Sequence, residues 1–218
     1  DEFREMGYLP EALSNYMAFL GWSPKSADRE ILSLEEISEI FDLSEINKAG
    51  AKFSWEKLNW INSQYIKNME SIKLIEIIRK YWDDNGWEPP SQEWANKLAI
   101  LIRDSMTLLK DSIDQSKPFF LIPTIQKEGQ DFLENRESKL SLKLILNYLI
   151  EQNTIKLNKE KAKEIINEIS KKHNIKKGIL MKSLRVAFFG SLSGPDLIQS
   201  WELFAESKTD RTRIERCL

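Results

Sequence analysis

The stretch that decides the fold is KKGILMKSLRVAFFGSLSGPDLIQSW, residues 176–201. Apolar side chains recur at helical spacing as far as Gly190, a residue suited to the left-handed turn that ends many helices. A short SLSG turn follows, and Pro195 is placed to begin the next helix, because the first helical position tolerates proline. The stretch therefore predicts two helices joined by a tight turn.

The same helical signals recur along the rest of the chain. Ser33 with Glu36 forms a capping box, and Ser54 and Ser91 precede two further apolar stripes. Pro118 and Pro123 bracket an apolar segment, PFFLIP, that is predicted to interrupt the helices. No run of residues alternates in the way that predicts a strand, so the predicted fold class is all-α. Helices are expected over 10–21, 34–41, 55–65, 70–84, 92–108, 127–136, 139–152, 159–173, 177–189, 195–206 and 209–217.

Composition excludes several classes of protein. The chain has 218 residues, of which 41% are hydrophobic and 30% charged, values typical of a globular protein. No apolar run reaches the length of a membrane span, and the acidic opening DEFREMGYLP is unlike a signal peptide. With one cysteine, Cys217, no internal disulfide can form, and a reducing, cytoplasmic setting is expected.

Signals for catalysis are missing. The eight glycines form no phosphate-cradling motif, and the single histidine, His173, falls at a predicted helix end where a cation is favoured. One histidine and one cysteine cannot supply the usual metal sites. We therefore expect neither catalytic nor metal-ligating residues in this chain.

Charge is distributed unevenly along the chain. Residues 1–118 carry 14 basic and 21 acidic side chains, a net charge of −7, whereas residues 119–218 carry 18 and 13, a net charge of +5. A basic half suggests a polyanionic partner. A solvated, lysine-rich helix surface explains the same pattern equally well.

Residues 47–66, NKAGAKFSWEKLNWINSQYI, combine aromatic rings with lysines and amides. The spacing of Trp55, Leu58, Ile61 and Tyr65 predicts that these side chains lie in the core. Outside that stripe are Lys48, Lys52, Asn59 and Trp60, which suit contact with a nucleic-acid backbone.

Arg185 stands in a strongly apolar part of the predicted helix that ends at Gly190. Such an arginine either pairs with a carboxylate inside the protein or is held rigid to bind a planar ligand such as a base edge or a phosphate. The residues themselves leave both alternatives open.

Three segments, in this order and spacing, resemble the C-terminal part of bacterial-type glutamyl-tRNA synthetases, with cyanobacterial and plastid members the most similar. They are GYLPEALSNYMAFLGWSP (7–24), NKAGAKFSWEKLNWINSQYI (47–66) and MKSLRVAFFGSLSGPDLIQSW (181–201). Neither the Lys-Leu-Ser-Lys-Arg loop nor the His-Ile-Gly-His signature of that family is present. The chain thus resembles a portion that follows the catalytic domain, so we expect no cofactor here, with ATP and magnesium bound elsewhere in the parent enzyme.

The resemblance implies a domain layout. Residues 1–68 resemble a helical region that contacts the tRNA stem. Residues 69–118 and 119–218 resemble two helical-bundle subdomains that bind the anticodon.

The resemblance also implies roles for individual residues. Arg185 in LRVAFFG and Arg103 in LAILIRDSMTLLKD match the arginines that read anticodon bases in the family. Gly194, Pro195 and Leu197 match the loop that packs against bases. The family motif has Leu-Thr-Gly where this chain has Phe188, Phe189 and Gly190, a departure that affects the packing of the loop. Phosphate contacts are expected from Lys48, Lys52, Lys176, Lys177 and Lys182.

The favoured interpretation is therefore the tRNA-binding part of a glutamate–tRNA ligase, itself non-catalytic, monomeric and not bound to membranes. Its partner would be glutamate tRNA, and the sequence leaves open whether glutamine tRNA is a partner too. The alternative is a helical module that binds another protein and has no nucleic-acid specificity.

Overall fold

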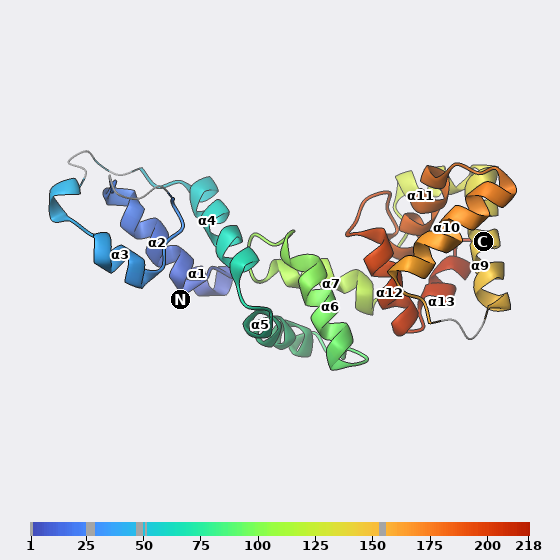
Figure 1. Ribbon diagram of the computed structural model, residues 1–218, viewed down its shortest axis with the longest axis horizontal. Helices are drawn as coiled ribbons and strands as arrows, with labels where there is room; N and C mark the ends of the chain where they lie inside the picture. Colours follow the sequence, from blue (N-terminus) through green and yellow to red (C-terminus); the bar gives the residue numbers. More distant parts are fainter. Residues whose placement is uncertain (1, 25–28, 47–49, 51, 153–155) are drawn as a thin grey trace. The chain divides into compact units, whose positions relative to one another are not determined.

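The structure, a computed structural model, describes residues 2–24, 29–46, 50, 52–152 and 156–218. These residues form helices from end to end, and the all-α prediction is confirmed (Figure 1). The described part contains one isolated β-bridge, between Trp22 and Ile46, and no strand. The helices are α1 (Glu2–Met6), α2 (Pro10–Gly21), α3 (Leu34–Ile40), the 3₁₀ turn η1 (Leu43–Glu45), α4 (Trp55–Asn68), α5 (Ser71–Asp84), α6 (Gln92–Arg103), α7 (Asp111–Phe120), α8 (Lys127–Leu133), α9 (Arg136–Glu151), α10 (Lys159–His173), α11 (Lys177–Phe189), α12 (Leu197–Glu206) and α13 (Asp210–Glu215).

Caps define several of these helices as the sequence predicted. Ser33 accepts a hydrogen bond from the Glu36 N–H, and the Glu36 side chain accepts one from the Ser33 N–H, which completes the capping box. Ser54 accepts from the Lys57 N–H at the start of α4. Helices α10 and α11 have the predicted bounds.

The predicted helix over 92–108 is wrong at its end. Helix α6 ends at Arg103, because the Asp111 carboxylate accepts hydrogen bonds from the N–H groups of Thr107 and Leu108 at 2.9 and 2.8 Å and holds a turn there. Ser105 and Leu108 therefore do not continue the α6 stripe.

The helix before PFFLIP continues further into this segment than the sequence predicted. Helix α7 contains Pro118 and runs on to Phe120. The aromatic rings of its last two residues are anchored: Phe119 stacks on Phe204 with ring centroids 5.0 Å apart, and Phe120 meets Trp94 edge-on at 5.2 Å. This packing offsets the hydrogen bond that proline cannot donate.

The described residues group into two compact units. Unit 1 comprises Asp1–Gly86 and Ile102–Gln115, and unit 2 comprises Trp87–Leu101 and Ser116–Leu218. Each unit has its own buried tryptophans: Trp22 and Trp82 in unit 1, Trp94 and Trp201 in unit 2.

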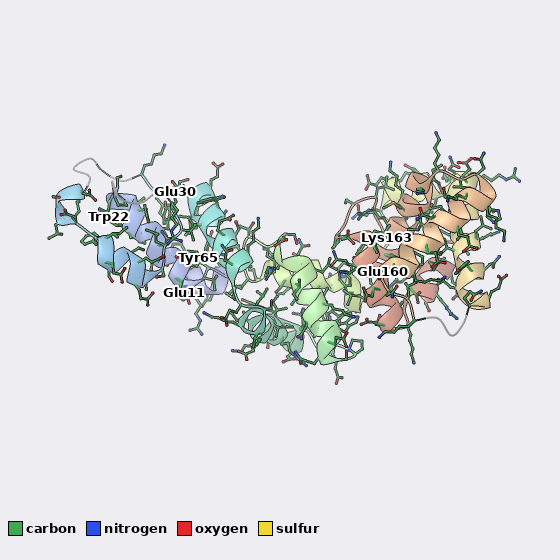
Figure 2. All side chains as sticks on the ribbon, in the orientation of Figure 1. Glu11, Trp22, Glu30, Tyr65, Glu160 and Lys163 are labelled. Carbon is green, nitrogen blue, oxygen red and sulfur yellow. The ribbon has the colours of Figure 1, made fainter. Side chains whose placement is uncertain are left out.

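Unit 1 packs α2 against α3 and α4. Buried Asn62 of α4 accepts a hydrogen bond from the Leu9 N–H at 2.9 Å and donates one to the Thr107 carbonyl at 2.6 Å. Tyr65, which Figure 2 labels beside Glu11, donates to the Leu32 carbonyl. Its burial, followed by the nearby Glu11 carboxylate, raises the pKa of Tyr65 to about 12. These bonds fix the loops of unit 1 to α4.

The predicted core stripe of α4 is confirmed at Leu58 and Ile61, which are buried, and is wrong at Trp55, which is 51% exposed. Trp55 occupies the first position of the helix, outside the α2–α4 contact. Its ring packs against the rings of Phe3 and Phe53 instead, at centroid distances of 5.9 and 4.9 Å.

Unit 2 is a helical bundle in which α11 packs on α9, α10 and α13. Leu184, Phe188 and Phe204 are among the side chains in its core. Lys97 of α6 forms ion pairs with Glu202 and Glu206 of α12 at 3.2 and 2.6 Å, and the Trp94 indole N–H donates to the Leu203 carbonyl at 2.8 Å. The segment 87–101 is thereby attached to α12.

Candidate nucleic-acid interface

The turn between α11 and α12 begins with two close backbone approaches at Gly190. Helix α11 ends at Phe189, and its C-cap residue is Gly190, whose φ of 72° lies in the left-handed region. A Cβ at this position would stand 2.2 Å from the Thr124 carbonyl oxygen, so only glycine fits. The Gly190 carbonyl in turn accepts a hydrogen bond from the Gln126 N–H at 2.8 Å. The segment before α8 therefore locks the start of the turn.

Arg185 holds the far end of the same turn. Its Nη1 donates to the carbonyl oxygens of Gly194 and Pro195, at 3.0 and 2.9 Å. The side chain is half-buried, and no carboxylate of the described residues forms an ion pair with it. Arg185 is thus fixed through one guanidinium nitrogen, and its remaining N–H groups are donors that a ligand can use.

The ring of Phe189 lies directly against Gly194. A Cβ on Gly194, whose φ is 152°, would stand 2.8 Å from Cδ2 of the Phe189 ring. That ring packs against Phe119 and Phe204 at centroid distances of 5.9 and 5.8 Å. Phe189 thus sets the distance between the turn and the core of unit 2.

Helix α12 starts at Leu197, later than the sequence predicted. Asp196 is its N-cap and accepts a hydrogen bond from the Gln199 N–H at 2.8 Å, which leaves Pro195 in the turn. Leu197 is 1% exposed, and its side chain belongs to the core of unit 2. The structure therefore brings together Arg185, Gly194 and Pro195 at the surface and places Leu197 beneath them.

Two arginines that the sequence analysis did not single out donate hydrogen bonds to carbonyls at the end of α11, just before the turn. Arg213 is fully buried, and its Nη1 donates to the Phe188 carbonyl at 3.0 Å. Nη2 of Arg216 donates to the Ala187 carbonyl at 3.1 Å. Both acceptors lie in the last turn of α11, where carbonyls lack partners within the helix. No local signal marks these two arginines, because both stand in the charged segment DRTRIERCL, residues 210–218.

Arg213 keeps its charge in this setting. Burial, followed by the neighbouring Arg216, lowers the pKa of Arg213 to about 10, still far above neutrality. The guanidinium also lies 4.2 Å from the centroid of the Phe204 ring. Carbonyl oxygens and a ring face therefore solvate this cation in place of water.

The predicted phosphate-binding lysines of α11 are all exposed. Lys176 is the N-cap residue of the helix, Lys177 its first residue, and Lys182 lies further along. No ion pair engages any of these three described lysines. They are available to a polyanion.

In unit 1, Lys52 is exposed and lines a cavity of about 450 Å³, together with Arg29, Lys57, Tyr16 and Trp22 among other residues. Lys57 is paired with Glu30 and lies 4.6 Å from the centroid of the exposed Trp60 ring. Lys48 lies outside the described residues.

Arg103 is the last residue of α6 and belongs to unit 1, whereas Arg185 belongs to unit 2. The Nε of Arg103 stands 3.9 Å from the Asp104 carboxylate, and a quarter of the Arg103 side chain is exposed. That buried Nε has no hydrogen-bond partner among the described residues.

The described residues contain no cluster of histidine, cysteine or acidic side chains that could hold a metal ion. Cys217 is buried, and burial raises the pKa of its thiol, so it stays protonated at neutral pH. Among the described helices, none has the length and apolar character needed to cross a membrane.

Two family models match the chain. Residues 73–218 match the model described as "Anticodon binding domain". Residues 1–60 match "tRNA synthetases class I (E and Q), catalytic domain", so that model extends over most of the segment that the sequence analysis assigned to stem contact.

Curated relatives named "Glutamate--tRNA ligase" match along the whole chain. That of Prochlorococcus marinus (strain AS9601) is 97% identical over 218 residues, and that of Prochlorococcus marinus (strain NATL2A) is 46% identical over 217. The chain spans about half of these relatives, 46% of the length of each.

A solved structure is also similar. The crystal structure of a glutamate tRNA ligase from Elizabethkingia meningosepticum CCUG26117, in complex with its amino acid, superposes with a TM-score of 0.91 at 31% sequence identity. The match covers 99% of this chain and 42% of that one. The comparisons do not favour the alternative of a helical protein-interaction module.

Proposed function

The chain belongs to the family of anticodon binding domains, and on that premise we propose that it is the tRNA-binding part of a glutamate–tRNA ligase. The parent enzyme would attach glutamate to its tRNA with ATP and magnesium, which would bind in a part of the enzyme outside this chain. The observation that carries the proposal is the attachment of Arg185 to the Gly194 and Pro195 carbonyls, because it presents a fixed guanidinium on a rigid turn.

The mechanism follows from how proteins read single-stranded RNA. Anticodon bases splayed out of their loop are held against a firm surface and read along their Watson–Crick edges by fixed donors and acceptors. The free N–H groups of Arg185 are donors of this kind, and Pro195 offers an apolar surface. We assign the same role to Arg103. Phosphate contacts from Lys52, Lys176, Lys177 and Lys182, and from Lys48, would add affinity without sequence information.

The proposal includes the layout of the chain. Residues 1–68 would contact the tRNA stem, and residues 69–118 and 119–218 would form the two anticodon-binding subdomains. The protein would act as a monomer in the cytoplasm. Glutamate tRNA is the proposed partner, with glutamine tRNA as a second partner to be tested in the same assay.

The test is binding of the 218-residue chain to glutamate tRNA, glutamine tRNA and an unrelated tRNA, each over a series of salt concentrations. We expect preference for glutamate tRNA and a steep fall of affinity with salt, because each phosphate contact adds about 0.7–0.9 to the logarithmic slope. Equal affinity for all three RNAs at every salt concentration would contradict anticodon reading.

A further inference from the structure

A cavity of about 450 Å³ lies in unit 1, and the C-terminal half of α2 forms part of its lining. The rest of the lining comes from residues within 22–24, 29–30 and 52–61, the last of which include the start of α4. Trp22 and Glu30 of this lining are labelled in Figure 2. The volume is in the range of pockets that hold small ligands, about 300–1,000 Å³. By size, the cavity therefore accommodates a small molecule.

Aromatic side chains make up much of the apolar lining. Tyr16, Phe19 and Trp22 all contribute, and the rings of Phe19 and Trp22 pack together with centroids 5.6 Å apart. Tyr16 and Trp22 are almost fully buried, so the surrounding structure holds their rings in place. The Tyr16 hydroxyl also accepts a hydrogen bond from the Ser54 N–H at 2.6 Å, which connects α2 to the segment before α4. Rings fixed in this way favour a ligand with a flat apolar part.

The charged side chains of the lining are mainly cationic. Arg29, Lys52 and Lys57 stand against the single carboxylate of Glu30, a net charge of +2 in a unit whose net charge is −7. Arg29 is paired with Glu36, and Lys57 is paired with Glu30. Among the described residues, Lys52 has no ion-pair partner. An anionic ligand can therefore pair with Lys52 without breaking an existing ion pair.

A ligand that uses the whole lining needs both an apolar and an anionic part. The phosphate groups of an RNA backbone need only exposed cations and make no use of buried aromatic rings. An uncharged apolar molecule makes no use of the ammonium group of Lys52. A flat ring that carries an anionic group matches both parts of the lining.

We propose that this cavity binds a small organic anion in which a flat ring carries a phosphate or a carboxylate group. The ring packs against Phe19 and Trp22, and the anionic group pairs with Lys52. Nucleoside monophosphates and aromatic carboxylates share this chemistry. The inference goes beyond the proposed function, because the ligand is not part of a tRNA and its binding is tested without RNA.

The test is a calorimetric titration of the 218-residue chain with four probes. AMP and indole-3-acetate each combine a ring with an anionic group, whereas adenosine lacks the anion and inorganic phosphate lacks the ring. We expect AMP or indole-3-acetate to bind at least about tenfold more tightly than adenosine or phosphate. Which of the two binds more tightly tells whether the anionic group is a phosphate or a carboxylate. If neither binds more tightly than adenosine and phosphate do, the inference is wrong.

Two variants locate the binding. Lys52→Met should weaken binding of the preferred anion by about tenfold and leave the affinity for adenosine unchanged, because only the anionic group contacts the ammonium. The matched control is Lys67→Met, an exposed lysine at the end of α4 that does not line the cavity, and it should bind as the wild type does. Phe19→Leu, which keeps an apolar side chain but removes the ring, should weaken binding of both the anion and adenosine.

The variants also provide the result that would overturn the inference. If the anion binds Lys52→Met as tightly as Lys67→Met, or if Phe19→Leu binds both probes as the wild type does, the ligand lies elsewhere on the chain. Preference for glutamate tRNA is measured separately, so the proposed function would stand after either result.

Discussion

In the proposed function, Arg185 both ties the turn together and reads a base. Its two bonds to the Gly194 and Pro195 carbonyls use one nitrogen of the guanidinium. The planar group is therefore oriented before any ligand arrives, which reduces the entropy lost on binding. A lysine at this position has one flexible ammonium group and cannot supply the same fixed edge.

Replacing Arg185 by alanine should therefore cost about 1–3 kcal/mol of binding free energy, and only toward RNAs that carry the preferred base at one anticodon position. The measurement is the affinity for glutamate tRNA and for single-base anticodon variants. Lys182→Ala is the matched control on the same helix: it should weaken binding to all of them alike and reduce the salt slope. A uniform loss in Arg185→Ala would argue against base readout.

The two glycines at the ends of α11, Gly178 in its first turn and Gly190 at its C-cap, should respond in opposite ways to alanine. Gly190→Ala places a Cβ 2.2 Å from the Thr124 carbonyl oxygen at a positive φ, so we expect a loss of about 3 kcal/mol in the free energy of unfolding. Gly178→Ala meets nothing within 4 Å in the first turn of the same helix, so we expect a gain of about 0.5–1 kcal/mol. Chemical denaturation measures the free energy of unfolding of both variants. Equal changes in the two variants would contradict the close approach at Gly190.

At the scale of helices, several of the boundaries that the sequence predicted correctly are set by local caps. Ser33, Ser54 and Asn158 each accept a hydrogen bond from a backbone N–H of the helix they precede. Such caps depend on residues three positions apart and can be seen in the sequence. Two errors have different causes. At the end of α6 the sequence analysis missed a local contact, because Asp111 bonds to Thr107 and Leu108 only four and three residues away. At Pro118 distant contacts decide, because aromatic packing against Trp94 and Phe204 carries α7 through the proline.

The attachment of α6 to α12 depends on Lys97, whose Nζ lies within 3.2 Å of three carboxylates, those of Glu93, Glu202 and Glu206. Hydrogen bonds to these groups, that to Glu206 foremost, raise the pKa of Lys97. A raised pKa means that the stabilisation is complete below the unfolded-state value near 10.5 and is lost only as the pH rises through the higher folded-state value.

Lys97→Met should accordingly lower the free energy of unfolding by about 1–2 kcal/mol at neutral pH, since the half-buried carboxylates of Glu202 and Glu206 lose their shared cation. The difference in Tm from the wild type should stay constant between about pH 6.5 and pH 9 and narrow in stronger alkali. Lys163→Met on α10, an exposed lysine labelled in Figure 2, is the control and should change little. If the Tm difference between Lys97→Met and the wild type already narrows near neutral pH, the raised pKa of Lys97 is contradicted.

For the whole molecule, the division of charge noted along the sequence persists in three dimensions. Unit 1 holds 12 basic and 19 acidic residues, a net charge of −7, and unit 2 holds the remaining 20 and 15, a net charge of +5. The turn between α11 and α12 and the exposed lysines of α11 belong to the basic unit. This agreement between charge and site could be foreseen from sequence, because charge follows composition.

The sequence could not predict which side chains hold the site in place. The carbonyl bonds of Arg213 and Arg216 join α13 to α11 across more than twenty residues of chain. Nothing in the local pattern identifies the acceptors, since a backbone carbonyl is present at every residue. Similarly, the hydrogen bond that the Leu192 N–H donates to the Glu128 carboxylate spans 64 residues.

The distribution of tryptophans gives each unit its own optical signal. Indole fluorescence shifts to longer wavelength when a buried ring becomes hydrated. Each fully buried tryptophan therefore reports the unfolding of the unit that surrounds it. Replacing the tryptophans of one unit by phenylalanine would leave an emission spectrum that follows the other unit alone, during melting or titration with RNA. The seven reporters divide into Trp22, Trp55, Trp60 and Trp82 in unit 1 and Trp87, Trp94 and Trp201 in unit 2.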